Sequence, residues 1–230
     1  MNEKDFKINK GVITRYTGTK TNVVIPQEIR GIAVRVIGAW AFANKRLINV
    51  IIPESVTKIG AYAFSYNELT EIVISNSITE IGEYVFYKNQ LTKIIIPNSV
   101  TKIGHFSFGN NLLTEVVIPE GVKEIGNCAF LDNQLVAITI PNSVIKIGEW
   151  AFRNNQLTDI VIPEGVTQIN SDAFTDNQLN SITILGKVSL PRKTKYPRPA
   201  FDNNFDDFYK SSKKRKGTYL FNGTNWSIRE

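Results

Sequence analysis

A unit of 22 residues recurs through most of this 230-residue chain, and this repeat constrains the fold more than any other feature. Leucine opens each unit, at Leu47, Leu69, Leu91, Leu113, Leu135, Leu157 and Leu179. Phenylalanine keeps the same step at Phe42, Phe64, Phe86, Phe108, Phe130, Phe152 and Phe174. A fixed period of this size is typical of a solenoid, in which each coil contacts only its neighbours.

Each unit begins with a predicted strand. In the unit that opens at Leu69, apolar residues alternate with polar or exposed positions through Ile72 and Ile74, which predicts a strand with one buried face. Proline follows in most units, as at Pro97, and ends the strand at the same level because it lacks an N–H and has a fixed φ. A second short extended stretch follows, with Ile78 predicted to point inward.

Glycine and asparagine mark the bends of each unit. The second stretch ends at Gly38, Gly60, Gly82, Gly104, Gly126 and Gly148, and at Asn170 in the seventh unit. Because Gly and Asn accept positive φ most readily, we predict a left-handed backbone at all seven positions. The Ala-Phe pair that follows is expected to close a helical or 3₁₀ turn. The asparagines three residues after each phenylalanine are expected to form a buried ladder that satisfies backbone groups: Asn67, Asn89, Asn111, Asn133, Asn155 and Asn177.

Different segments are expected to cap the two ends of the array, since a terminal coil would otherwise expose its core and a strand edge. Residues 1–22 contain a predicted hairpin that turns at Asn9-Lys10-Gly11. Residues 23–185 form the predicted solenoid. Residues 186–230 form a predicted C-terminal cap, which holds a basic, proline-rich insertion and a closing hairpin around Asn222-Gly223-Thr224.

The frame L-x-x-I-x-I-P-x-S-V-x-x-I-G-x-x-A-F-x-x-N-x resembles the BspA-type leucine-rich repeats of bacterial surface proteins, over roughly residues 20–205. The segments Gly-Val-Ile-Thr-x-Tyr-Thr-Gly and Gly-Thr-Tyr…Trp-Ser also look like the capping segments of that family. The family often has a cysteine after Ala-Phe, where this chain has asparagine. The resemblance implies a β-dominated leucine-rich-repeat solenoid of the α/β horseshoe class. It would be a right-handed stack of about seven coils, with a parallel sheet on one side and short 3₁₀ or helical turns opposite. It also implies non-enzymatic binding or adhesion, often to host or matrix proteins.

Composition and motifs exclude several classes of function. No apolar run approaches the length of a membrane span, so membrane insertion is not expected. The sequence contains no P-loop, dinucleotide fingerprint or zinc spacing, so no cofactor or metal is expected. His105 is the only histidine and has no nucleophile or carboxylate at a recognisable spacing, while Cys128, the only cysteine, is expected to be inert packing. We therefore predict no catalytic residues and no enzyme.

The net charge of +6 is concentrated near the C-terminus, because residues 186–216 contain ten Lys and Arg against three Asp. Its densest part is Lys210-Ser-Ser-Lys-Lys-Arg-Lys216. This segment would attract phosphate, acidic glycan or an anionic membrane if it acted as a site. Since no aromatic residues or groove motif accompany it, a solvated loop is favoured and no specific nucleic acid is expected.

Two rows of strand residues are expected to face the concave surface. One row comprises Asn49, Glu71, Lys93, Glu115, Ala137, Asp159 and Ser181. The adjacent row comprises Ile51, Val73, Ile95, Val117, Thr139, Val161 and Thr183. An exposed stripe of β-branched residues is a candidate protein-binding surface, although such residues also simply suit strands. The alternating signs of the first row, and of Lys58, Glu80, Lys102, Glu124 and Lys146, are explained by cross-strand pairing without a ligand.

A third row lies two residues before each phenylalanine: Trp40, Tyr62, Tyr84, Phe106, Cys128, Trp150 and Asp172. Five of these seven residues are aromatic, in slots where the repeat does not demand burial. Aligned aromatic rings about 5 Å apart would make a flat strip able to stack on sugars or to bury a partner's apolar side chains. The alternative is that they shield the turns of neighbouring coils.

These observations favour a non-enzymatic binding or adhesion module of a bacterial surface or secreted protein, which recognises a protein partner through exposed repeat positions. Host and extracellular-matrix proteins are the partners that the resemblance suggests, and a glycan is the other class. The alternatives are a structural spacer that projects another domain and a carbohydrate-binding module that uses the aromatic row. We expect a monomer. The start of the sequence lacks the apolar core of a secretory signal, so surface display or secretion would require an excised segment, and a cytoplasmic protein is the alternative.

Overall fold

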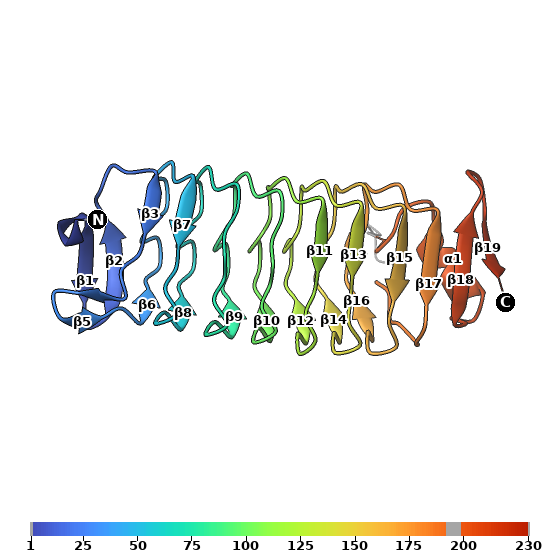
Figure 1. The fold of residues 1–230 in the computed structure, drawn as a ribbon. Helices are drawn as coiled ribbons and strands as arrows, with labels where there is room; N and C mark the ends of the chain where they lie inside the picture. Colours follow the sequence, from blue (N-terminus) through green and yellow to red (C-terminus); the bar gives the residue numbers. More distant parts are fainter. Residues whose placement is uncertain (1, 192–198, 230) are drawn as a thin grey trace.

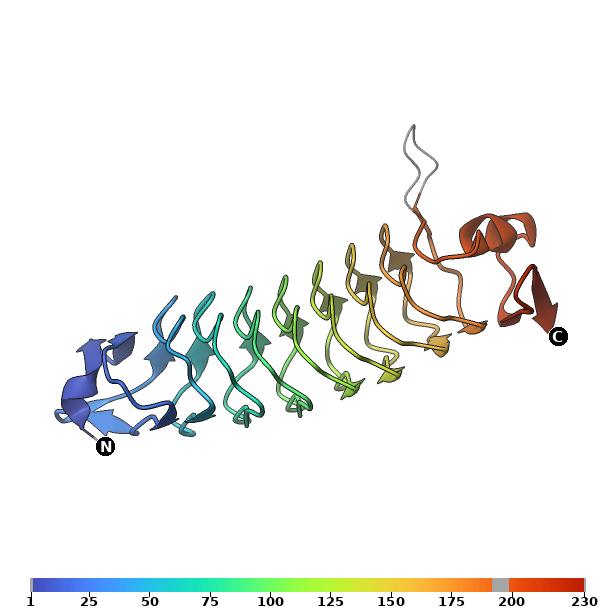
Figure 2. The same cartoon turned by 90° about the horizontal axis from the view of Figure 1, so that it is seen from above.

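The computed structural model describes residues 2–191 and 199–229 and shows an elongated solenoid (Figure 1). Two rows of short strands run along its length, and a hairpin lies at each end. Viewed from above, the coils follow one another in sequence order from the N-terminal to the C-terminal cap (Figure 2). The predicted solenoid with mainly parallel strands is confirmed. In the described part of the chain, no helix combines the length and apolar character needed to cross a membrane.

The first strand row is built from the Leu-x-x-Ile-x-Ile segments. It contains β3 (Asn22–Val24), β7 (Asn49–Ile51), β11 (Glu115–Val117), β13 (Ala137–Thr139), β15 (Asp159–Ile162) and β17 (Ser181–Ile184). Between β7 and β11 the coils contribute only the parallel bridges of Val73 with Ile51 and with Ile95. Leu69, Ile72 and Ile74 are buried as predicted.

The second strand row follows the prolines and is also parallel. It contains β6 (Val36–Ile37), β8 (Lys58–Ile59), β9 (Glu80–Ile81), β10 (Lys102–Ile103), β12 (Glu124–Ile125), β14 (Lys146–Ile147) and β16 (Gln168–Ile169). Isoleucines of successive coils pair in register, as Ile103 does with Ile125, and the row is interrupted once, between β8 and β9. These isoleucines point inward, and Ile78 before them is fully buried, as predicted.

The third side of each coil is a pair of tight turns rather than the helical or 3₁₀ turn that was predicted. In one coil the Ala63 N–H donates to the Gly60 carbonyl, and the Ser65 N–H donates to the Tyr62 carbonyl. Tyr62 belongs to both turns and has a φ of 59°. This left-handed conformation prevents the two turns from continuing as a helix. Every residue of the aromatic row shares this conformation. A second left-handed residue follows four positions later in each coil: Asn44, Tyr66, Lys88, Asn110, Asp132, Asn154 and Asp176.

The prediction of left-handed backbone at the glycine slot is therefore wrong, because none of those seven residues has positive φ. The glycines are required for a different reason, the close approach of consecutive coils. A Cβ added to Gly104 would lie 2.6 Å from the carbonyl carbon of Gly82, and one added to Gly126 would lie 2.7 Å from that of Gly104. Gly60 and Gly148 are equally crowded by the backbone of the preceding coil.

The asparagine ladder is confirmed and ties each coil to the next. Asn111 donates from Nδ2 to the carbonyls of Phe86 and Phe108, both at 3.0 Å. Its Oδ1 accepts from the Leu91 N–H at 3.1 Å. The same pattern recurs at the other asparagines of the slot. Every side-chain amide therefore satisfies backbone groups of two coils at a buried bend.

The core is one continuous stack of phenylalanine rings flanked by Leu, Ile and Val. Successive rings from Phe42 to Phe201 lie 5.0 to 5.8 Å apart, centroid to centroid, and are nearly parallel. Tyr16 continues the stack beyond Phe42 at 5.4 Å. At the other end Phe205 meets Phe201 edge to face. The caps thus close the core with aromatic side chains of their own.

The N-terminal cap consists of a short 3₁₀ helix (Glu3–Asp5) and the predicted hairpin of β1 (Phe6–Asn9) and β2 (Val12–Tyr16). Its β2 strand pairs in parallel with β6. Five extra residues in the first coil form a small hairpin of β4 (Glu28–Ile29) and β5 (Ile32–Ala33).

The C-terminal cap contains a helix that the repeat did not predict, α1 (Phe205–Ser211), followed by the predicted hairpin of β18 (Gly217–Phe221) and β19 (Trp226–Arg229). Strand β18 pairs antiparallel with β17 and so covers the last edge of the first strand row. The buried carboxylate of Asp206 accepts from the Ala200 and Phe201 N–H groups, which fixes α1 against the last coil.

The crowding at the glycine slot gives a paired prediction. Gly104→Ala should lower the free energy of unfolding by about 1–3 kcal/mol, because its Cβ would overlap backbone atoms that cannot move independently. Gly82→Ala is the matched control, since its Cβ would come no closer than 3.3 Å to the Ile59 carbonyl oxygen. We expect the control to stay within about 1 kcal/mol of the parent chain in denaturant unfolding. Equal losses for both variants would contradict the close-approach explanation.

The asparagine ladder gives a second prediction. Asn111→Ala should destabilise the chain by about 3 kcal/mol or more, because each buried backbone group left without a partner costs about 1–3 kcal/mol. Asn98→Ala, on the exposed corner of the same coil, is the control and should have little effect. Thermal and denaturant unfolding measure both. An unchanged stability for Asn111→Ala would show that the ladder does not hold the coils together.

Candidate functional site

The first strand row exposes a continuous apolar stripe. Its residues point away from the core between the buried isoleucines, and their exposed fractions reach 77% at Val73 and 82% at Ile95. We call it the valine row: Val24, Ile51, Val73, Ile95, Val117, Thr139, Val161 and Thr183. Its outward direction follows from strand alternation. The most exposed part of the row, Val73 and Ile95, lies where the coils are joined by single bridges rather than by strands.

The charged row beside it is also exposed. Lys93 and Glu71 approach within 4.0 Å, and both side chains are mostly in solvent. Such a pair contributes about 0–1 kcal/mol, so both side chains remain available to a partner. Together with Val73 and Ile95 they line a shallow, largely apolar depression between the two coils. Glu115 and Asp159 continue the row and are exposed, and Asp159 accepts from the Thr158 hydroxyl at 3.1 Å.

The second strand row carries charges that balance one another. Lys102 lies in register between Glu80 and Glu124. Glu124 in turn forms an ion pair with Lys146 at 2.9 Å. Cross-strand pairs of opposite charge stabilise a sheet, so this row is explained by folding.

The aromatic row forms a stack rather than a flat strip. Trp40 lies over Tyr62 at 4.0 Å, Tyr62 over Tyr84 at 4.3 Å, and Tyr84 over Phe106 at 4.6 Å, with interplanar angles of 6° to 8°. The faces of the inner rings are therefore covered by their neighbours, and only edges face solvent. Trp40 is the end of the stack and remains 51% exposed. Of the rings in this stack, Trp40 is therefore the most accessible to a sugar.

Two further aromatic residues close the same surface. Tyr87 meets Tyr84 and Phe106 edge to face, and Tyr66 meets Tyr87 in the same way. Burial, followed by the neighbouring Tyr62, raises the pKa of Tyr84 to about 12. The sequence pattern did not indicate Tyr66 and Tyr87, because each occupies a slot that is not aromatic in the other coils.

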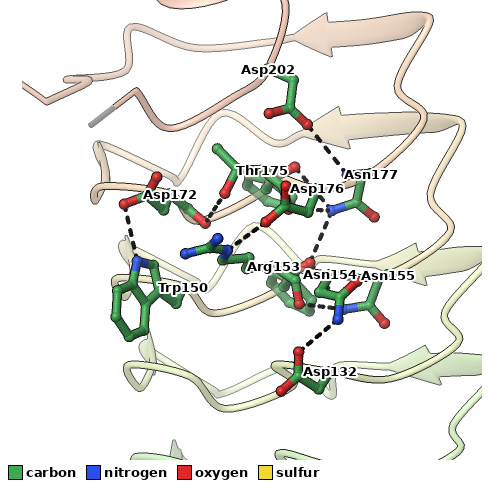
Figure 3. A network of polar contacts seen from close by, with 12 residues as sticks. Asp132, Trp150, Arg153, Asn154, Asn155, Asp172, Thr175, Asp176, Asn177 and Asp202 are labelled. Carbon is green, nitrogen blue, oxygen red and sulfur yellow. Dashed lines mark hydrogen bonds and ion pairs between the residues drawn. The ribbon is translucent and has the colours of Figure 1, made fainter. Parts of the chain in front are cut away.

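The ring stack ends at Phe106, because buried Cys128 follows in the aromatic row, and a polar network around Trp150 and Asp172 takes its place (Figure 3). Trp150 donates from Nε1 to Asp172 at 3.0 Å, and Arg153 donates to Asp176 at 2.6 Å while its guanidinium lies over the Trp150 ring. Asp132 accepts from Asn154 at 2.8 Å. The sequence did not predict this network, although Asp and Asn are common at left-handed positions.

These carboxylates already have protein donors, which accounts for their positions without a ligand. Asp132 accepts from Asn110 as well as from Asn154. In residues 2–191 and 199–229, no three His, Cys, Asp or Glu side chains form a group that could hold a metal ion.

The two residues considered for catalysis both have structural partners. His105 accepts at Nδ1 from the Asn127 N–H at 2.8 Å, in a slot where Asn127 makes the corresponding contact to Glu149 in the next coil. Cys128 is 4% exposed, and burial raises the pKa of its thiol to about 12, with Glu149 and Asp132 acting in the same direction. A thiol of this kind stays protonated and is a poor nucleophile near neutral pH.

The basic cluster lies partly in α1 and partly beyond it, so it is not the simple loop expected. Lys210 in α1 donates to the Pro191 carbonyl at 2.9 Å. Lys216 pairs with Glu164 at 2.6 Å and so links the cap to the seventh coil. Lys213 and Lys214 are exposed. Most of the proline-rich part of the insertion, residues 192–198, lies outside the described residues.

Comparison with known proteins agrees with the architecture. The family model described as BspA type leucine rich repeat region matches residues 15–134 and 79–204, with six copies. The crystal structure of a leucine rich cell surface protein from Faecalibacterium prausnitzii A2-165 is 28% identical, with a TM-score of 0.69, and the match covers 97% of this chain. The chain spans 58% of the length of that protein.

A second similar structure is the leucine rich repeat protein of T. pallidum. It is 26% identical, with a TM-score of 0.54 and 81% of each chain covered. None of the curated proteins compared matches the chain.

The raised pKa of Tyr84 predicts alkaline sensitivity of the aromatic stack. An unfolded tyrosine ionises near pH 10, whereas Tyr84 in the folded chain ionises at about pH 12. The stability that its neutral phenol contributes is therefore complete below about pH 10 and is lost as the pH rises towards 12. Tyr84→Phe should show a smaller drop in melting temperature between pH 8 and pH 11 than the parent chain. Identical pH dependence in both would contradict this.

Proposed function

Because the chain belongs to the BspA-type leucine-rich repeat family, we propose that it is a non-enzymatic protein-binding module whose contact surface is the valine row. The observation that carries this proposal is the continuous exposure of branched apolar residues along one strand face. Soluble monomers rarely expose contiguous apolar patches unless a partner covers them.

The strand face suits protein recognition for a physical reason. Its exposed side chains alternate with isoleucines buried in the core, so the backbone that presents them is rigid before a partner arrives. A preformed surface loses little conformational entropy on binding. At about 4.8 Å per coil, the valine row from Val24 to Thr183 extends for roughly 34 Å, long enough for a sizeable interface.

Surface display and adhesion belong to the same proposal. The F. prausnitzii relative is described as a cell surface protein, which supports a bacterial surface location for this chain. In that setting the partner would be a host or extracellular-matrix protein. The alternative of a spacer that projects another domain uses the same fold but assigns no role to the exposed valine row.

Carbohydrate binding is the second candidate function, and the geometry favours one position for it. Trp40 ends the aromatic stack and is its exposed ring, whereas Tyr62, Tyr84 and Phe106 are half-buried. Planar aromatic side chains with an open face bind the apolar face of sugars. Trp40→Ala should abolish any glycan binding of the chain, as measured on a glycan array.

The protein-binding proposal predicts that Val73→Asp combined with Ile95→Asp weakens partner binding about tenfold or more, which corresponds to about 1.4 kcal/mol. The probes are purified extracellular-matrix proteins and binders selected from a random-peptide display library. Asn76→Asp combined with Asn98→Asp adds the same charge on the exposed corners of the same two coils and serves as the control. Circular dichroism establishes that both variants fold.

Two results would contradict the proposal. One is that binders of the parent chain bind the Val73/Ile95 variant as tightly as the control. The other is that neither the matrix proteins nor the library yields any binder, which would favour the spacer.

A further inference from the structure

Acidic residues flank the valine row on both sides. On one side they lie two positions before the apolar residue, at Glu71, Glu115 and Asp159. On the other side they lie three positions after it, at Glu54, Glu120 and Glu164. All six are exposed. In the described chain the one basic residue in these two flanking rows is Lys93.

This charge pattern is specific to the strand face. The body of the chain is close to neutral, and the second strand row alternates in sign from coil to coil. In these flanking rows the signs alternate only through Glu71, Lys93 and Glu115, which cross-strand pairing explains. The other acidic residues of the two rows have no basic residue beside them in the same row. The contact of Lys216 with Glu164 shows that a lysine already binds at the C-terminal end of one flank.

The fifth and seventh coils present the pattern most completely. Each places one exposed valine between two carboxylates: Val117 between Glu115 and Glu120, and Val161 between Asp159 and Glu164. Two coils are separated by about 9.6 Å, since neighbouring strands lie about 4.8 Å apart. Two turns of an α-helix rise by about 10.5 Å, so residues seven apart on a helix repeat at nearly the same distance.

From these observations we infer that the partner is a cationic amphipathic helix, laid along the solenoid axis with its apolar stripe on the valine row. This inference rests on the proposed function and names its ligand class. A helix presents an apolar stripe with Lys or Arg on both sides, which matches three parallel rows of acidic, apolar and acidic residues. An extended strand alternates its side chains between two faces, so it cannot place basic residues on both sides of a central apolar line.

The test uses a synthetic helical peptide of about five turns, with a leucine stripe flanked by lysines. Fluorescence anisotropy measures its binding to the full chain. The control peptides replace the lysines by glutamates, or keep the composition and scramble the order so that no stripe forms. We expect the lysine helix to bind, both controls to bind at least about tenfold more weakly, and the affinity to fall as salt is raised.

Variants of the chain locate the site. Glu115→Gln, Glu120→Gln and Asp159→Asn together should weaken binding about tenfold or more. Glu80→Gln, Glu83→Gln and Glu124→Gln remove the same number of carboxylates away from the valine row, and this control should change the affinity less than about threefold. Val117→Asp with Val161→Asp should also weaken binding, although it adds negative charge, because the apolar contact is lost.

Several outcomes would overturn the inference. They are equal binding by the scrambled peptide, equal losses in the two carboxylate variants, and tighter binding by the Val117/Val161 variant. Self-association that is lost when Lys213 to Lys216 are replaced by alanine would assign the face to a second copy of the chain. If the lysine helix fails while library binders still depend on Val73 and Ile95, only this inference falls. If both fail, the proposed function falls with it.

Discussion

The hydrogen bonds of one buried asparagine per coil hold this solenoid together. Each amide joins the carbonyls of two successive phenylalanines and accepts from the N–H of a leucine that opens a coil, as Asn111 does. These bonds lie inside the bend, where water cannot replace them, so their loss would leave several buried groups unsatisfied. Because the geometry is the same in every coil, it sets the distance at which the phenylalanine rings stack and the valine row repeats.

The same close spacing determines where the backbone adopts unusual conformations. Two left-handed residues per coil turn the chain sharply enough to return it to the strand, and a non-glycine residue held there costs on the order of 1–3 kcal/mol. In the N-terminal half, stacking of the rings from Trp40 to Phe106 offsets part of that cost, at about 0.5–1.5 kcal/mol per pair. In the C-terminal half, hydrogen bonds such as that from Trp150 to Asp172 take over. The aromatic row therefore has a structural role even if Trp40 also binds a ligand.

The repeat predicted the solenoid, the buried strand residues and the asparagine ladder, and turn residues in the end segments predicted both capping hairpins. It failed at the glycine slot because a recurring glycine indicates that a side chain is not tolerated, without indicating why. A glycine required for positive φ and a glycine required for close backbone approach look the same in a sequence. The structure distinguishes the two cases, because a Cβ on Gly104 would overlap the backbone of Gly82. The left-handed aromatic slot was missed because Trp, Tyr and Phe have no preference for that conformation. Helix α1 occurs once, so no repetition indicated it.

For the candidate site, the sequence placed the valine row and its charged neighbour on an exposed face. It did not reveal that the aromatic rings cover one another, because slot spacing fixes the distance between side chains but not the tilt of their rings.

Residues that the repeat does not require are the candidates for binding a partner. Folding explains an alternating row such as Lys102 between Glu80 and Glu124, since each charge stabilises its neighbours. It does not explain why carboxylates lie on both sides of Val117 and Val161. There Asp159 accepts a hydrogen bond from the neighbouring Thr158 hydroxyl at 3.1 Å, and Glu164 pairs with Lys216. Like charges on one face cost free energy unless a partner neutralises them. Their persistence beside an exposed apolar stripe is thus better accounted for by a cationic partner than by the fold.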